Sequence, residues 1–356
     1  MKKEKKKTKR LRLFDFQRDG KGVSKSDADM APGFKKFFIT YKNNFNKLIS
    51  VNIFMVLGNF PLLFLIINLS GYFQDPYFLP FSDLFQNIGG LFVAEGDITP
   101  YKMTLFALEG LQSQTLAPTV VTYIFYGLSA LSLLTFGVIN VGTAYIIRNM
   151  VSGEPVFVWQ DFWYAVRRNL KQALPFGAID LGIIAILCVN IYSTFTSLTA
   201  SGGFMPSVLF WSNIVLFILY FFMRYYMYVQ MVTFKLSVFK MIKNSLILSV
   251  LGFKRNICGF LGIAILIVLE IVFLFGAGGI LIPLAVAAPL AILFSTMAFI
   301  KVYAAYPKIK QHMIDPYLEE HPEEAPETPD DEPIMRDDVT EQQRLDAIRK
   351  RNNIQN

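Results

Sequence analysis

The chain has very few of the residues that build metal and nucleophilic sites. Among its 356 residues are two histidines, His312 and His321, and both lie in the polar C-terminal tail. A histidine-based metal site or a Ser/His/Asp triad is therefore excluded from the apolar part of the chain. The two cysteines, Cys188 and Cys258, cannot form a disulfide framework, and we expect both to be free thiols. The sequence predicts no cofactor, no metal site and no enzymatic activity.

Charge is also scarce, since 17% of the residues are charged against about 25% in soluble domains. The composition is 53% hydrophobic and includes 34 phenylalanines, which favours surfaces that face lipid. No apolar segment of a signal peptide follows the basic start. The fold class that we predict is an all-α membrane protein with six transmembrane helices, because six apolar runs are long enough to cross a bilayer. They cover about 48–69, 119–147, 175–198, 208–232, 259–279 and 281–304.

The distribution of basic residues predicts the orientation of these spans. All but two of the 34 Lys and Arg residues lie before the first span, in the 148–174 and 233–258 loops, or after residue 300. Positive charge is retained on the cytoplasmic side, so we expect both termini inside and the 70–118 loop outside. The expected location is a bacterial plasma membrane. The basic rim favours contact with anionic lipid headgroups and not with nucleic acid.

The two ends differ from the membrane domain, to which we assign residues 34–306. Residues 1–33 form a basic segment that we expect to be disordered. Residues 307–356 form an acidic cytoplasmic tail. Its stretch from Asp315 to Asp338 is rich in Asp, Glu and Pro, and we expect this stretch to be disordered. Thr340 and Gln343 fit a capping box, which predicts a short helix near the C-terminus.

A register of five positions precedes three of the six spans. Counted from Asn44, Asn169 and Asn256, the positions are −10, −7, −6, −3 and +1, and fourteen of these fifteen residues are apolar. This spacing puts the five side chains on one face of a helix, as in an amphipathic helix at a membrane surface. Two explanations stay open. The chain is three repeats of a two-helix unit, or any helix that enters a membrane from its basic side has this pattern.

The loop between the second and third spans carries the most specific motif, and six of its residues are candidate functional residues: Arg148, Asn149, Glu154, Asp161, Phe162 and Asn169. Gly153 and Pro155 break the chain here, and a carboxylate at Asp161 favours a helix N-terminus. Arg148 and Asp161 are placed to pair across the loop. Before it, Gly137 and Gly142 allow close helix approach. A rigid structural elbow and a ligand-binding surface both fit these residues.

The same motif resembles the YesL-like family of bacterial membrane proteins. The resemblance lies in a small-residue span end, an Arg-Asn pair, an acidic turn, an Asp-Phe pair and a basic-Asn-apolar run, here Gly137–Gly142, Arg148–Asn149, Glu154, Asp161–Phe162 and Arg168–Leu170. Asn59-Phe60-Pro61 resembles the proline-bearing first helix of that family. The resemblance implies no established activity but an association with carbohydrate uptake and utilisation. It favours an accessory or regulatory protein, with a sugar-permease complex as partner and the elbow as contact surface.

Three ionisable residues stand out inside the spans, where such residues are costly: Asp180, Arg224 and Glu270. Asp180 and Arg224 are at similar depth on consecutive spans, so we expect an ion pair, unless Arg224 extends to the headgroups. Glu270 is expected near the midplane, where it is either a hydrogen-bonded structural group or a coupling site. A secondary transporter of a small solute that uses these three residues is the alternative function. An intramembrane enzyme is a third, without a recognisable nucleophile.

Overall fold

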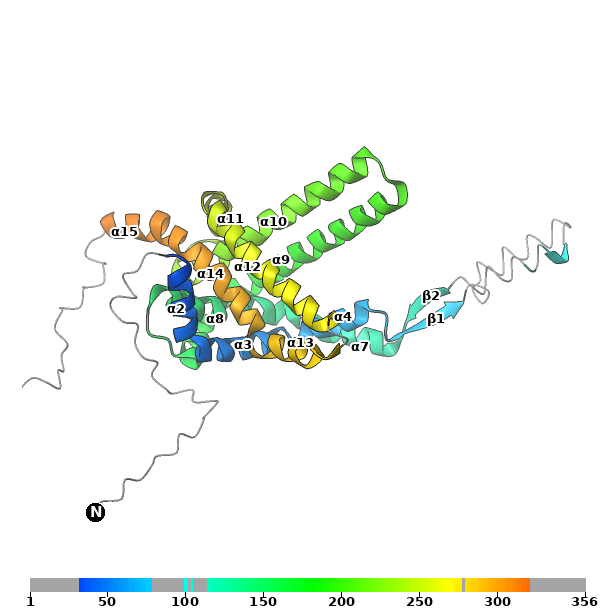
Figure 1. The fold of residues 1–356 in the computed structure, drawn as a ribbon, viewed down its shortest axis with the longest axis horizontal. Helices are drawn as coiled ribbons and strands as arrows, with labels where there is room; N and C mark the ends of the chain where they lie inside the picture. The colour runs from blue at the N-terminus through cyan, green and yellow to red at the C-terminus, as the bar shows by residue number, and fades with distance from the viewer. Residues whose placement is uncertain (1–31, 79–98, 102–103, 105–113, 277–278, 321–356) are drawn as a thin grey trace, which may run out of the picture. The chain divides into compact units, whose positions relative to one another are not determined.

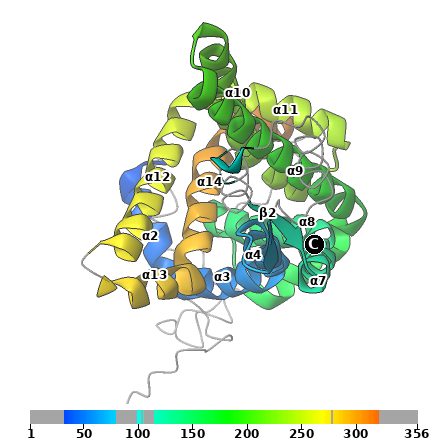
Figure 2. The same cartoon turned by 90° about the vertical axis from the view of Figure 1, so that its right-hand side faces the viewer.

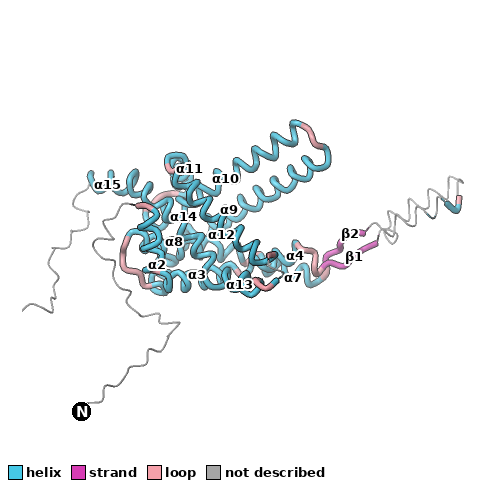
Figure 3. The backbone as a smooth tube through the Cα atoms, viewed as in Figure 1, coloured by secondary structure: helices cyan, strands magenta, loops and turns pink. Residues whose placement is uncertain are grey.

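The computed structural model describes residues 32–78, 99–101, 104, 114–276 and 279–320 (Figure 1). These residues are almost all helical, with one pair of short strands (Figure 3). Five helices are long and apolar enough to cross a membrane, and the number is six if the bent pair α3–α4 is one span. The predicted fold class is confirmed. The predictions for residues 1–31, the middle of the 70–118 loop and the helix at Thr340 lie outside the described residues.

The chain divides into two compact units, Met1–Ile309 and Lys310–Asn356. The described part of the second unit contains the π-helix η4 (Lys310–Ile314) and α15 (Asp315–Glu320). The helices of the first unit follow the predicted spans and the amphipathic stretches before them. They are α2 (Phe34–Asn43), α3 (Phe45–Asn59), α4 (Pro61–Leu69), α7 (Val120–Ser129), α8 (Ser132–Ser152), α9 (Val158–Ser201), α10 (Phe204–Thr233), α11 (Val238–Leu251), α12 (Phe253–Phe275), α13 (Ile282–Ala288), η3 (Pro289–Leu293) and α14 (Phe294–Ile309).

The first predicted span is bent. Helices α3 and α4 meet at Phe60 with an angle of 57° between them. Pro61 occupies the first turn of α4, where its missing N–H is tolerated but the α3 hydrogen-bond ladder cannot continue. The predicted span over about 48–69 therefore corresponds to a bent pair of helices, with the break at the proline.

The last predicted span contains a π-helical turn between α13 and α14. Pro289 opens this turn and cannot donate a backbone hydrogen bond. The Asn52 side chain of α3 donates to the carbonyl oxygens of Pro289 at 2.7 Å and Leu290 at 2.9 Å, and it accepts from the Ser295 N–H at 2.9 Å. Asn52 therefore satisfies the backbone groups that the irregular turn leaves free, as expected for an interhelical hydrogen-bonding residue.

Helix α9 joins two elements that the sequence analysis treated as separate. The amphipathic stretch around Asn169 and the third span form one helix of 44 residues, about 66 Å long at 1.5 Å per residue. Pro175 lies inside it without ending it. In the other two copies the helix does end, at Asn44 between α2 and α3 and at Gly252 between α11 and α12.

The return helices of the three predicted units form the centre of the bundle (Figure 2). Helices α8, α10 and α14 contact one another. Helix α3 packs on α8 and α14, and α9 packs on α10 and α8. Helix α12 packs on α14, and its Phe260 ring contacts Phe221 and Phe222 of α10. Each entering helix thus contacts the return helix of its own unit and that of the preceding unit, a cyclic order that agrees with three two-helix units.

The amphipathic stretches are only partly packed. Their positions −10 and −6 are exposed in all three copies, at Phe34, Phe38, Trp159, Trp163, Leu246 and Val250. Position −7 is Phe37, Phe162 or Ser249, and each of these side chains is at least partly buried. Val166 at position −3 is also buried, so the face that the register predicts divides into an exposed aliphatic and aromatic row and a packed part, which suits a helix lying at a membrane surface.

The ends of the 70–118 loop pair as strands. Strand β1 (Gln74–Phe78) runs antiparallel to β2 (Gln114–Pro118). The sequence analysis treated this segment as a loop throughout, and the hairpin was missed because Pro76 and Pro118 are unfavourable in strands.

Two glycines of α8 lie in close contact with α9. A Cβ atom on Gly137 would lie 2.0 Å from the backbone oxygen of Ala173 and 2.8 Å from the Cα of Gly177. A Cβ atom on Gly142 would lie 2.4 Å from the Phe162 ring. The predicted role of Gly137 and Gly142 in close helix approach is confirmed.

Candidate functional site

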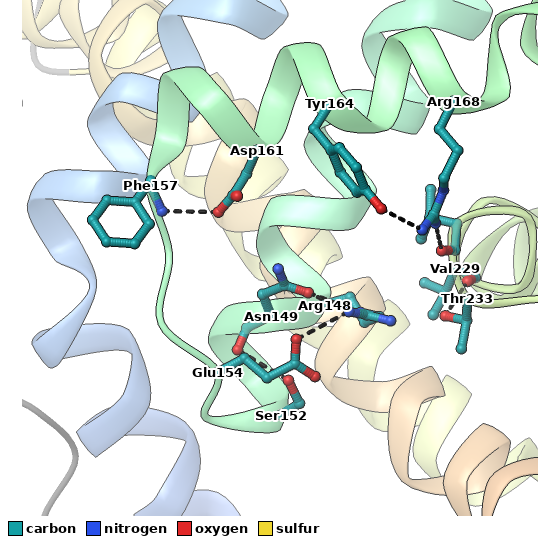
Figure 4. A network of polar contacts seen from close by, with 11 residues as sticks. Arg148, Asn149, Ser152, Glu154, Phe157, Asp161, Tyr164, Arg168, Val229 and Thr233 are labelled. Atoms are coloured by element: carbon teal, nitrogen blue, oxygen red, sulfur yellow. Dashed lines mark hydrogen bonds and ion pairs between the residues drawn. The ribbon is translucent and has the colours of Figure 1, made fainter. Parts of the chain in front are cut away.

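The base of the elbow is a hydrogen-bonded turn at the end of α8 (Figure 4). Gly153 has φ +88°, a left-handed conformation that glycine adopts without strain. The N–H groups of Gly153 and Glu154 both donate to the Asn149 carbonyl. The Arg148 guanidinium donates to Asn149 Oδ1 at 2.5 and 2.9 Å and forms an ion pair with Glu154 at 3.1 Å. Three predicted site residues are therefore joined in one network.

Asp161 holds the start of α9. Its carboxylate accepts a hydrogen bond from the Phe157 N–H at 2.8 Å, in the first turn of the helix (Figure 4). This is the helix-capping role expected from the sequence. The predicted ion pair between Arg148 and Asp161 is wrong, because the guanidinium is bound by Glu154 within its own turn.

Phe162 packs the elbow against the helix bundle. Its side chain is 2% exposed, lies against Gly142 of α8 and stacks on Phe54 of α3 with the ring centroids 4.4 Å apart. Among the described residues, Asn169 donates to the Ala165 carbonyl of its own helix, at 2.9 Å. Both residues therefore have structural roles in the elbow.

The outward surface of the first turns of α9 carries a different set of residues. A shallow hollow of about 640 Å³ is lined by Trp159, Gln160, Trp163, Tyr164, Arg167 and Arg168. Arg168 donates to the Val232 carbonyl at the end of α10, and its guanidinium lies 5.2 Å from the Tyr164 ring centroid. We call these six residues the elbow surface. The sequence analysis missed Tyr164, Arg167 and Arg168 as site residues, although aromatic and arginine side chains at helical spacing were a visible signal.

A second cluster lies between the helices of the bundle. The Asp180 carboxylate of α9 is fully buried and accepts three side-chain donors of α10. They are Tyr220 OH at 2.7 Å, Tyr228 OH at 2.5 Å and the Nε of Arg224 at 2.9 and 3.1 Å. The predicted ion pair is confirmed. The two tyrosines at i and i+8 flank Arg224 on one helix face, so the carboxylate is fully satisfied.

Lys301 on α14 completes this cluster and was missed by the sequence analysis. It was counted with the basic tail, although it lies inside the predicted span 281–304. Its Nζ lies 6.0 Å from the Phe221 ring centroid of α10, and its charge interacts with those of Asp180 and Arg224. We call Asp180, Arg224 and Lys301 the charge cluster.

Glu270 is not part of the charge cluster. It lies five residues before the end of α12, about 8 Å along the helix axis, and not at the middle of the helix. Its side chain is half-buried and forms no hydrogen bond or ion pair with another described residue. The midplane position of Glu270 stays a prediction, and its expected hydrogen-bonded role has no protein partner among the described residues.

One comparison with known proteins links the elbow to a family. Residues 116–191 match the family described as "Protein of unknown function, DUF624". The match covers about a fifth of the chain and includes α7, α8, the elbow and Asp180. It supports the sequence analysis in placing the most specific motif here and assigns no activity. No match was found among the curated proteins or the solved structures.

Proposed function

We propose that this protein is a non-enzymatic accessory or regulatory protein of a bacterial plasma membrane that contacts a sugar-permease complex through the elbow surface. The link to carbohydrate uptake rests on the resemblance to the YesL-like family. The contact through the elbow rests on the observation that exposed tryptophan, tyrosine and arginine side chains gather on a rigid support.

Two physical features favour recognition by the elbow surface. Trp, Tyr and Arg are the residues that most often dominate the binding energy of protein interfaces. Trp159 is 63% exposed and Tyr164 is 52% exposed, so their apolar area is open to a partner. The support beneath them is already ordered by the Asp161 cap and the packed Phe162, which reduces the entropy lost on binding.

The test is affinity purification of the intact, tagged protein from its own membrane. We expect sugar-permease subunits to be recovered with the wild type and to be lost with Trp159→Ala. Trp211→Ala is the matched control, because Trp211 on α10 is equally exposed and lies far along the chain from the elbow. Equal recovery with both variants would place the contact elsewhere, and failure to recover any permease would oppose the accessory function.

The transporter is retained as the second candidate because the charge cluster lies among three helices of the bundle. The three residues proposed for a transporter do not form one site, however, since Glu270 is separate from the Asp180–Arg224 pair. Solute uptake by vesicles that contain the purified protein, reduced by Glu270→Gln, would favour the transporter over the accessory function.

A further inference from the structure

The charge cluster has more positive than negative charge. One carboxylate, Asp180, faces two cationic side chains, Arg224 and Lys301, which come from different helices. The carboxylate oxygens already accept from Arg224 and from both tyrosines, so Asp180 has little capacity left for Lys301. Unbalanced charge inside a membrane domain is costly, which makes it a candidate for ligand binding.

Most donors of Arg224 are unused. A guanidinium has five N–H donors, and here only the Nε bonds to Asp180. Neither Nη atom has a hydrogen-bond acceptor among the described residues. The side chain is 15% exposed, so it is not completely enclosed by packing.

Lys301 also has unused hydrogen-bond donors. Its ammonium group has no hydrogen-bond acceptor in the part of the chain that the structure describes, and its side chain is only half-buried. Phe221, which it approaches, is three residues before Arg224 on α10, so the two side chains share one helix face. Lys301 of α14 therefore lies beside the part of α10 that carries Arg224, and the two positive charges interact.

Aromatic rings compensate these charges in part. The Arg224 guanidinium lies 5.5 Å from the Phe136 ring centroid, and Lys301 lies 6.0 Å from that of Phe221. Cation–π contacts are weaker than charge-assisted hydrogen bonds to an anion. The rings therefore stabilise the two cations in part and leave their N–H donors free.

We propose that Arg224 and Lys301 bind an oxyanion, a phosphate group. The two Nη atoms offer the planar, bidentate geometry that such groups prefer, and the lysine adds a point charge. Arg224 lies nine residues before Thr233 and Lys301 eight residues before Ile309, depths of about 12 to 14 Å from the helix ends. The ends lie on the predicted cytoplasmic side, so the anion comes from a soluble metabolite or a lipid headgroup.

The experiment measures the thermal stability of the intact protein in nanodiscs. In discs of phosphatidylcholine alone, inorganic phosphate is titrated at constant ionic strength. In a second arm without phosphate, discs that contain phosphatidylglycerol are compared with the neutral discs. A ligand at free concentration L that binds only the folded state stabilises it by RT ln(1 + L/Kd), so the melting temperature rises with ligand concentration and reports the apparent Kd. Stabilisation in the first arm identifies a free anion, and stabilisation in the second arm alone identifies a headgroup.

The variant Lys301→Met is expected to weaken the phosphate effect at least tenfold in apparent Kd, or to abolish the lipid effect. Lys240→Met, which removes an exposed lysine of α11, controls for general surface charge. Lys301→Arg keeps the positive charge and should retain the stabilisation by phosphate or lipid. This variant keeps the proposal testable if Lys301→Met fails to fold. The proposal is overturned if neither probe stabilises the wild type, or if Lys301→Met and Lys240→Met respond alike.

Discussion

The Asp180–Arg224 pair offers a direct test of how the bundle is held together. Asp180→Leu leaves the Arg224 guanidinium and the hydroxyl groups of Tyr220 and Tyr228 without their acceptor. Removal of one partner of a buried ion pair costs about 3–5 kcal/mol, because the remaining charge is uncompensated. We expect the free energy of unfolding to fall by about that amount.

The double variant separates the orphaned charge from the lost packing. Asp180→Leu combined with Arg224→Met removes both charges, so its loss should be smaller than the sum of the two single losses by about 2 kcal/mol. The measurement is reversible unfolding of the intact protein in mixed micelles, followed by tryptophan fluorescence. Asn213→Leu is the control on α10, since Asn213 is half-buried and donates to the Leu209 carbonyl of its own helix.

Additive losses would refute this reasoning. They would mean that Asp180 and Arg224 are each stabilised by other groups and that their contact contributes nothing of its own. A loss of less than about 1 kcal/mol for Asp180→Leu would also contradict it, since that is the size expected for one ordinary neutral hydrogen bond.

Three further predictions concern packing, the broken helix and orientation. Gly137→Ala should lower the free energy of unfolding by about 1–3 kcal/mol, because the added Cβ would clash with backbone atoms. Gly182→Ala is the control and should be neutral or stabilising, because no atom lies within 4 Å of its added Cβ. Equal shifts of the melting temperature for the two variants would contradict this. Asn52→Ala should cost about 1–3 kcal/mol, since three hydrogen bonds of the π-helical turn are lost, and an unchanged melting temperature would show that other groups satisfy the turn. In a background without native cysteines, Glu95→Cys should react with a membrane-impermeant thiol reagent added to cells and Gln160→Cys should not; the reverse would overturn the predicted topology.

The positions of the spans were accessible from the sequence because hydropathy is local. A run of apolar residues has to be helical in lipid whatever its neighbours are, so five predicted spans correspond to helices and the sixth to the bent pair α3–α4. The break at Pro61 was also visible, since proline interrupts the hydrogen-bond ladder. Its angle of 57° depends on how α3 and α4 pack, which no local pattern contains.

The elbow was predictable in its residues and less so in its pairings. The glycine-bearing turn and the carboxylate at Asp161 act on their own backbone, and both were assigned correctly. The partner of Arg148 was assigned incorrectly, because Glu154 and Asp161 are both close to it in sequence and only the geometry of the turn decides between them.

The sequence by itself determined that the chain is an all-helical protein with spans suited to a membrane, with closely packed glycines and an acid–base pair at matching depth. Only the tertiary structure decided that the return helices α8, α10 and α14 meet at the centre and that Lys301 joins the pair. Contacts between residues 180, 224 and 301 depend on the order in which helices surround one another. Hydropathy and charge describe each helix against lipid and water, and they do not specify its neighbours.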